Sequence, residues 1–488
     1  MGPAASALRA LQAGGPQWLR RESVAPASRG RGAQRYRRAA FGGVAMLFSN
    51  GLKMLGALAT LPLALNYLGA ERFGLWATLT SLMLLANVGD LGIGDGLINA
   101  LSAAHGNDDR AMARIYVSSV FFTTLLLSSV LLAVLLAVEA VLPWPRLFHL
   151  SSPVARAEAA PAVKVLTLCI ILHVPLGVLV KIRTGYQEMH VSALWHSFGV
   201  VLGFGALVLS IWHGASLPWL VAADAGGNAV AMLGNLGCLF LVDRPWLRPS
   251  LRCVERGAAR ELLALGLQFF ALALIGMATF YSDNLLAIWA CGPQAAGLFA
   301  ICTRLFSPCR LFAGTMLGPL WPAYREAITR GDIAWVRRTI AASIVLSVLV
   351  VLPLALGLTV FGDTLARLWM RRPLVLGFGL LFGMALWVTV ETIGSAISYF
   401  LNAASMIRVQ LILGAVFSVV AIATKVTLAM HFGIAGIAWG RSFAYIGTTL
   451  FPSVRIIRRQ LRELASRTVE SPAAHLGQAN SLPVSNSE

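Results

Sequence analysis

Apolar runs along the chain alternate with short polar segments at intervals that suit membrane-spanning helices. A helix needs roughly 20 residues to cross about 30 Å of hydrocarbon. Runs of that length predict spans at 42–66, 73–98, 114–140, 161–181, 190–212, 217–241, 262–288, 296–320, 339–361, 374–400, 407–430 and 434–454. The pattern therefore predicts an all-α polytopic membrane protein with about 12 transmembrane helices.

A hairpin sequence that occurs twice divides these helices into two halves. The first copy, LPLALNYLGAERFGLWATLTSLMLLANVGDLGIGDGLINA, joins two apolar runs through a short charged turn. Four turn residues recur at one constant offset, so that Gly69, Gly74, Leu75 and Ala77 match Gly292, Gly297, Leu298 and Ala300. We predict six-helix lobes at 41–243 and 262–455, a cytosolic linker at 244–261, a basic disordered tail at 1–40 and a second cytosolic tail at 456–488.

Composition and charge place the chain in a membrane. Of its 488 residues, 57% are hydrophobic and 12% are charged, which is too few charges to cover a soluble domain of this size. The formal net charge of +18 would also suit a nucleic-acid-binding protein. However, twenty-seven of the 39 Lys and Arg residues fall on the side of the amino terminus and seven on the other side. By the positive-inside rule, we expect a multi-pass protein of the cytoplasmic membrane with both termini in the cytosol and no nucleic-acid partner.

The remaining five cations fall within predicted spans: Lys53, Arg304, Arg310, Lys425 and Arg441. A charge inside a span costs about 2.5 to 3.5 kcal/mol on insertion scales, so each should face a partner or a water-filled cavity. Counted from the hairpin turns, helix rise puts Lys53 and Arg310 at one level near the cytosol.

Acidic residues within the spans are candidates for ion pairs or ion coupling. Helix rise places Asp283 and Arg304 at similar depths on adjacent helices, so we predict that they pair, either in the cavity or as a structural bridge. Lys425 and Arg441 share a level on the last two helices, and Glu391 is their expected structural partner.

Four further polar groups fit either a functional or a structural role. Asp90 lies close to the inner edge, where it could couple an ion, cap a helix or bind loop arginines. Asp224 lies among small residues that permit close helix packing, and a functional and a structural role fit it equally. His173 and His196 could relay protons or could simply be hydrogen-bonded between helices.

Enzymatic motifs are missing from the sequence. It has neither a GK[ST] phosphate-binding loop nor an HExxH metal motif, and its six cysteines form no CxxC pair. The longest predicted outer loop, 143–160, carries one acid, Glu158. We therefore expect a protein that is not an enzyme and that needs no cofactor or metal.

The hairpin resembles the oligosaccharide flippases of the Wzx type. The segments YLGAERFGLWATLTSLMLL and NVGDLGIGDGL carry this resemblance, which places the chain in the polysaccharide transporter branch of the multidrug/oligosaccharidyl-lipid/polysaccharide (MOP) exporter superfamily. The resemblance implies two repeated lobes around a central cavity, which the first two helices of each lobe line. Lys53, Arg304 and Arg310 lie on such helices and are the predicted substrate-binding residues.

The function that the resemblance implies is translocation of a polyprenyl-diphosphate-linked oligosaccharide from the inner to the outer leaflet by alternating access. The lipid-linked oligosaccharide would be the partner of a monomeric protein, with a polysaccharide polymerase and a chain-length regulator as further expected partners. The alternative is an ion-coupled multidrug exporter of the MATE type, whose cargo is often cationic. The glycan and the coupling ion stay open.

Overall fold

The computed structural model describes residues 26–83, 89–142, 144, 148, 150–370 and 374–462, and the regular elements in these ranges are all helical. The first half contains α2 (Pro26–Ser81), α3 (Ile93–Gly106), α4 (Arg110–Val141), α6 (Pro153–Gly185), α7 (Met189–Trp212) and α8 (Leu217–Gly237). The second half contains α9 (Arg256–Leu305), α10 (Ser307–Phe312), α11 (Leu320–Thr329), α12 (Ile333–Met370), α13 (Phe378–Ala403), α14 (Ile407–Phe432) and α15 (Ala435–Tyr445).

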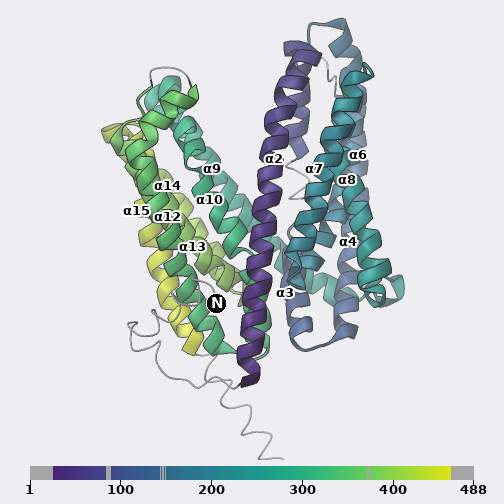
Figure 1. Ribbon diagram of the computed structural model, residues 1–488, viewed down its shortest axis with the longest axis vertical. Coiled ribbons are helices and arrows are strands. Elements are labelled where there is room, and N and C mark those ends of the chain that lie inside the picture. The colour runs from purple at the N-terminus through teal and green to yellow at the C-terminus, as the bar shows by residue number, and fades with distance from the viewer. Residues whose placement is uncertain are drawn as a thin grey trace, which may run out of the picture.

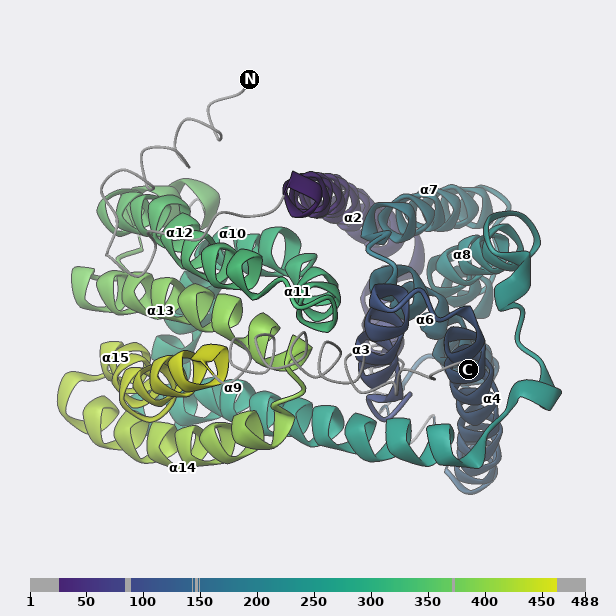
Figure 2. The same ribbon diagram turned by 90° about the horizontal axis from the view of Figure 1, so that it is seen from below.

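The two halves form two lobes that diverge in a V (Figure 1). Helices α2 to α8 make one lobe and α9 to α15 make the other. The lobes come together at the end where α2 begins and separate toward the opposite end. Seen from below, they lie side by side, and α9 runs along one edge of the molecule toward α4 (Figure 2). The predicted arrangement of two repeated lobes is thus confirmed.

The repeated hairpin turns have the same backbone conformation. Gly69 has φ 72° and ψ 170° within α2, and Gly292 has φ 84° and ψ 168° within α9. A positive φ costs glycine little because it has no Cβ, and each of these glycines reverses a helix in the same way. Each of the two elements therefore contains two helices.

Long apolar helices account for most of the predicted spans. Among the described residues, eight helices are long and apolar enough to cross a membrane. A ninth is present if the bent pair 294–305 and 307–329, which turns by 42°, counts as one span. Because α2 and α9 each contain two helices, the described chain accommodates about twelve in all, as predicted.

The second helix of each half is broken. In the first half, the chain restarts as α3 after a turn in which Gly92 has φ 74°. A Cβ at Gly92 would lie 2.4 Å from the carbonyl oxygen of Gly266, so only glycine lets the start of α3 approach α9 this closely. In the second half, α9 ends at Leu305 and a short α10 follows, with Pro308 in its first turn. Proline cannot donate the helical hydrogen bond, which agrees with an opened backbone at this position.

The prediction of a disordered tail is wrong for residues 26–40. This stretch is the first part of α2, and its apolar residues Tyr36 and Ala39 join a hydrophobic cluster of the second lobe. The Arg35 side chain is only 3% exposed and lies 5.1 Å from the ring centre of Trp335. The arginines of this segment therefore do more than set orientation, because at least one is a packing residue. Residues 1–25 and 463–488 lie outside the described residues, and the lobe and linker boundaries stay predictions.

Candidate functional site

A polar cavity in the first lobe contains Lys53. It consists of two adjoining spaces of about 240 and 660 Å³ between α2, α6, α7 and α8. Both spaces are lined by Lys53, His173, His196 and Asn228, and the two are together called the cavity of the first lobe. Lys53 therefore faces a cavity inside the first lobe, whereas the resemblance implied that it lines the central cavity between the lobes.

The polar groups of this cavity are only partly paired. His196 Nδ1 lies 2.6 Å from Asn228 Oδ1, whereas His173 Nδ1 is buried without a hydrogen-bond partner. Lys53 forms no ion pair or hydrogen bond within the described part of the chain. Asp224 lines the larger space, and its carboxylate also lacks an ion pair among the described residues. A cation without a protein counter-ion is therefore available to a ligand.

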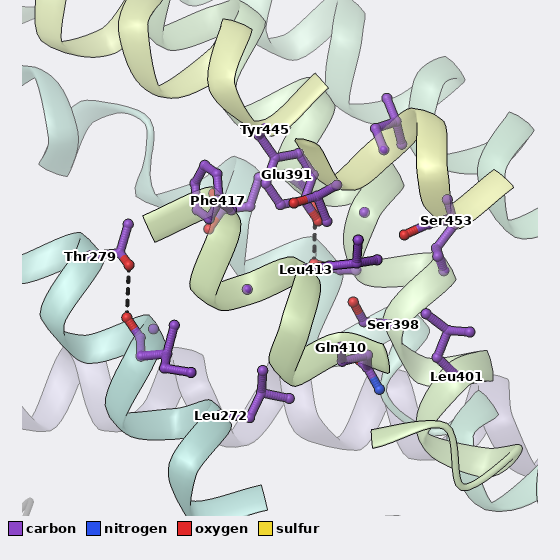
Figure 3. Close-up of a pocket in the computed structure, with 18 of the residues that line it drawn as sticks. Leu272, Thr279, Glu391, Ser398, Leu401, Gln410, Leu413, Phe417, Tyr445 and Ser453 are labelled. Atoms are coloured by element: carbon purple, nitrogen blue, oxygen red, sulfur yellow. Dashed lines mark hydrogen bonds between the residues drawn. The ribbon is translucent and has the colours of Figure 1, made fainter. Parts of the chain in front are cut away.

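A second polar site lies in the other lobe, around Glu391. The Arg310 guanidinium of α10 contacts Glu391 Oε1 of α13 at 3.1 Å and lies 5.5 Å from the ring centre of Phe280. Glu391 lines two cavities, of about 370 and 420 Å³, and Arg310 lines the second. The first is drawn in Figure 3, where Glu391, Tyr445 and Phe417 lie close together. The Arg310 side chain is 42% exposed, so this cation is also accessible.

A buried group of three charges lies deeper in the same lobe. Asp283 Oδ1 accepts a hydrogen bond from Lys425 Nζ at 2.7 Å, and its other oxygen binds Arg441. Lys425 is fully buried and also donates to the Thr279 carbonyl at 2.9 Å. The Arg441 guanidinium lies 4.1 Å from the ring centre of Trp387. The trio links α9, α14 and α15 and has a formal charge of +1.

The predicted ion pairs of this lobe are wrong. Asp283 pairs with Lys425 and Arg441 instead of Arg304, and Glu391 pairs with Arg310 instead of those two cations. The depth estimate from helix rise gave only a height along each helix, whereas the direction in which a side chain leaves the helix decides its partner. Arg304 is exposed, lines none of the four cavities above, and has no side-chain partner among the described residues.

Asp90 has a structural role of the kind that the sequence left open. Its two oxygens accept hydrogen bonds from the backbone N–H groups of Gly92 at 3.0 Å and Gly94 at 3.2 Å. It thereby satisfies donors at the start of α3 that have no partner within the helix. The neighbouring Asp95 accepts a hydrogen bond from Lys181 at 2.5 Å. Asp90 therefore fixes the helix start that contacts the second lobe.

Sequence reasoning missed a polar cluster that joins the lobes at their closed end. Glu326 of α11 accepts hydrogen bonds from Arg35 Nε at 3.1 Å, Gln187 Nε2 at 2.7 Å and Arg330 Nε at 2.9 Å. Arg330 also donates to the His105 carbonyl at 3.2 Å. The count of basic residues on each side of the membrane had treated Arg35 and Arg330 only as residues that set the orientation of the chain. Only the packing of α2 and α11 reveals that they meet one buried carboxylate.

A second missed cluster lies at the same end, within the first lobe. Glu188, between α6 and α7, accepts hydrogen bonds from Arg244 at 2.6 and 2.8 Å and from Arg183 at 3.2 Å. Burial alone would raise the pKa of Glu188, but the hydrogen bonds and positive charges of Arg244 and Arg183 outweigh it and leave the pKa below its ordinary value. The carboxylate is therefore ionised at neutral pH and holds the α6–α7 turn against the segment after α8.

Comparison with known families identifies the chain. The family described as "polysaccharide biosynthesis protein" matches residues 41–323, which is more than half of the 488 residues. The chain belongs to this family. The match confirms the resemblance to polysaccharide transporters that the hairpin sequence indicated, and it makes the chain a polysaccharide-related membrane protein of the MOP superfamily. No curated protein sequence matches it.

Solved structures share the fold of this polysaccharide biosynthesis protein. A MATE protein in its bent conformation superposes with a TM-score of 0.75 at 17% identity, over 89% of this chain and 99% of that one. An outward-facing multidrug resistance MATE transporter of the MOP superfamily gives 0.73 at 17% identity, over 88% and 97%. A MOP transporter from Pyrococcus furiosus, described as having reversed polarity in its binding pocket, gives 0.73 at 17%, over 88% and 96%. At this identity the similarity shows a common fold.

Proposed function

We propose that this protein is a flippase that moves a polyprenyl-diphosphate-linked oligosaccharide, such as an O-antigen, capsule or exopolysaccharide repeat unit, across the cytoplasmic membrane. The lipid tail would stay in the bilayer while the diphosphate and sugars pass between the lobes. Membership of the polysaccharide biosynthesis family supports this cargo class. Both termini would be cytosolic, as the distribution of basic residues predicts.

The observation that carries the proposal is the unpaired Lys53 in the cavity of the first lobe. A diphosphate cannot leave water without a counter-charge, because a charge buried alone is very costly. Lys53 has no carboxylate partner among the described residues, and Arg310 is half-exposed beside Glu391. These two cations would therefore replace water around the diphosphate, whereas Arg304, the third predicted substrate-binding residue, lines none of the four cavities.

The arrangement of the lobes supports alternating access. The lobes join through Glu326 and its partners at the end where the described chain begins, and they diverge at the opposite end. With cytosolic termini, this conformation is open to the outside. Two related lobes that rock about such a contact expose the central site to one side at a time.

The alternative function is ion-coupled export of cationic drugs. The fold shared with multidrug MATE transporters favours it. A cationic cargo would need free carboxylates. In the second lobe, Asp283 binds two cations and Glu391 binds a third, whereas Asp224 of the first lobe has no ion pair among the described residues. The charges of the second lobe therefore favour an anionic cargo over a cationic one.

Binding to the purified full-length protein in nanodiscs tests the proposal. The probe is undecaprenyl diphosphate carrying one N-acetylglucosamine, with tetraphenylphosphonium as the cationic competitor. We expect Lys53→Arg to bind like the wild type and Lys53→Gln to bind about tenfold more weakly, because a charge-assisted hydrogen bond is lost.

A cavity-filling variant adds an independent test. Gly177 lines the cavity of the first lobe, and a Cβ there would meet no atom within 4 Å, so Gly177→Leu should fill the space without disturbing the helix. Gly205 in α7 is equally open but lines neither space, which makes Gly205→Leu the matched control. Loss of binding in Gly177→Leu, with normal binding in Gly205→Leu, supports the site. Displacement of the probe by tetraphenylphosphonium, or unchanged binding in Lys53→Gln, would favour the exporter.

A further inference from the structure

The cavity of about 370 Å³ in the second lobe has mainly apolar walls that also carry several hydrogen-bonding groups. It lies between α9, α13, α14 and the segment that follows α15 (Figure 3). Hydroxyl and carboxamide groups from all four elements line it, including Thr279, Ser395, Ser398, Asn402, Gln410 and Ser453. Its volume is within the range of small-ligand sites, which is roughly 300 to 1,000 Å³.

Two buried polar atoms of lining residues lack a well-formed hydrogen bond to the protein. Trp387 Nε1 and Glu391 Oε2 are both buried and meet no described residue in full hydrogen-bonding geometry, although the two side chains lie close to each other on α13. The indole N–H can only donate and the carboxylate oxygen can only accept. Buried groups of this kind normally find a partner, and a ligand rich in hydroxyls would supply both an acceptor and a donor.

A carboxamide pair extends this polar wall. Gln410 Nε2 donates to Asn402 Oδ1 at 2.7 Å, which fixes the orientation of both side chains. The Asn402 Nδ2 group keeps its donors free of protein partners within the described residues. Preset donors and acceptors on rigid helices suit a ligand with several hydroxyls at fixed spacing.

Aromatic rings form another part of the lining. Trp387 and Phe417 are nearly parallel, with an interplanar angle of 4° and centroids 6.4 Å apart. Tyr445 stands edge-on to both, at 5.7 and 5.1 Å. The faces of aromatic rings are electron-rich and attract weakly positive C–H groups, such as those on the apolar face of a sugar ring.

The surrounding charges narrow the choice of ligand. Arg310 lies on the other side of Glu391, and the Arg441 guanidinium covers the Trp387 ring at 4.1 Å. With Lys425 and Asp283 also nearby, the second lobe has more cations than carboxylates in this region. A cationic aromatic drug would be repelled, whereas a neutral, polyhydroxylated ligand would meet no unfavourable charge.

We propose that this cavity binds one sugar residue of the cargo, with Glu391, Trp387, Asn402 and Gln410 recognising its hydroxyl groups. The assignment rests on the proposed function, since it places the glycan of the lipid-linked cargo. Glu391 also borders the cavity that contains Arg310, so a sugar on one side would lie next to the cation expected to hold the diphosphate on the other. In this arrangement one cavity recognises the sugar, and the neighbouring cavity, which contains Arg310, recognises the negatively charged diphosphate.

Saturation-transfer NMR on the full-length protein in nanodiscs tests this site directly. The probes are the methyl glycosides of glucose, galactose and N-acetylglucosamine, each titrated alone. Gly276 lines the cavity and a Cβ there would meet no atom within 4 Å, so Gly276→Leu should occupy the sugar position while keeping α9 intact. Gly357 in α12 is equally open and lines none of the described cavities, so Gly357→Leu is the matched control.

We expect at least one glycoside to bind wild type and Gly357→Leu equally, and to lose its signal in Gly276→Leu. Gln410→Leu should bind it about five- to tenfold more weakly, because one hydrogen-bond partner is removed at similar size. The lipid diphosphate without a sugar should still bind Gly276→Leu, and this separates the sugar site from the proposed function. If no glycoside binds, or if Gly276→Leu binds as the wild type does, the cavity is not a sugar site.

Discussion

Replacing Asp283 tests whether the buried trio holds the second lobe together. Asp283→Ala removes the single carboxylate that neutralises two buried cations, Lys425 and Arg441. Lys425 would keep its hydrogen bond to the Thr279 carbonyl but would have no opposite charge within ion-pair distance among the described residues. We therefore expect the loss of Asp283 to destabilise the fold before it affects transport.

The size of the effect follows from burial. Lys425 is fully buried, and Arg441 and Asp283 are 4% and 5% exposed at their side chains. Breaking a buried ion pair by removing one partner costs about 3 to 5 kcal/mol, because the other charge stays buried and uncompensated. Lys425→Met should cost much less, since it leaves Asp283 and Arg441 as a neutral pair and replaces the lysine stem with an apolar chain of similar length.

The assay is thermal unfolding of the purified variants in detergent, with membrane abundance measured in parallel. Asp283→Ala should unfold well below wild type and accumulate poorly, whereas Lys425→Met should stay close to wild type. Arg304→Ala is the control, because the exposed Arg304 has no part in the trio. An Asp283→Ala protein that is as stable and abundant as wild type but fails to transport would refute the structural role and make Asp283 a site residue.

Three other predictions concern the two ends of the molecule. Glu326→Gln should speed hydrogen exchange in α11, because the carboxylate that binds Arg35 and Arg330 at the contact between the lobes is lost. Unchanged exchange would show that this carboxylate does not hold the lobes together. Cysteines at Arg72 and Gln294, which follow the two hairpin turns, should crosslink only after the lobes close at their divergent end, so rapid crosslinking in the state described would contradict the V shape. Burial raises the pKa of Glu188, but the arginines around it lower the pKa by more. The stability that the ionised carboxylate contributes is therefore lost only as it protonates, so the melting temperatures of wild type and Glu188→Gln should converge as pH falls below about 4.3, the ordinary pKa of Glu. A difference that stays constant with pH would show that the charge is irrelevant.

The sequence predicted the fold because its signals are repeated and local. Apolar runs of sufficient length indicate spans regardless of how they pack, and Gly69 and Gly292 carry the same turn at a constant offset. The short turns His213-Gly214 and Phe432-Gly433, which precede the sixth and twelfth predicted helices, also have a positive φ at both glycines. Such patterns depend on neighbouring residues in the chain, so they can be read without knowing which helices touch.

The ion pairs could not be predicted in the same way. The sequence correctly indicated that Asp283, Lys425 and Arg441 lie within spans, but the depths estimated from helix rise assigned them the wrong partners. Two side chains at one depth meet only if both leave their helices toward the same interface, and this rotation depends on packing between helices that are far apart in sequence. Asp283 and Arg441, for instance, are separated by more than 150 residues and meet because α15 and α9 pack together.

The ordered start of α2 was missed for a related reason. An arginine-rich segment with one acid cannot form its own core, so composition alone predicts disorder. Its partner is supplied by the second lobe, where Glu326 and Asp332 bind Arg35 and Trp335 covers its guanidinium. Order therefore arises from contacts that no local pattern contains.

The central claim is that Lys53, which has no ion pair among the described residues, and the half-exposed Arg310 carry a lipid diphosphate across the membrane. The most direct test is the rate at which fluorescent undecaprenyl-diphosphate-linked N-acetylglucosamine changes leaflet in proteoliposomes that contain wild type, Lys53→Arg, Lys53→Gln or Arg310→Gln. We predict translocation by wild type and Lys53→Arg, with loss of translocation in both glutamine variants at normal protein incorporation. Equal rates in all four proteins, or transport of tetraphenylphosphonium in place of the lipid, would contradict the account.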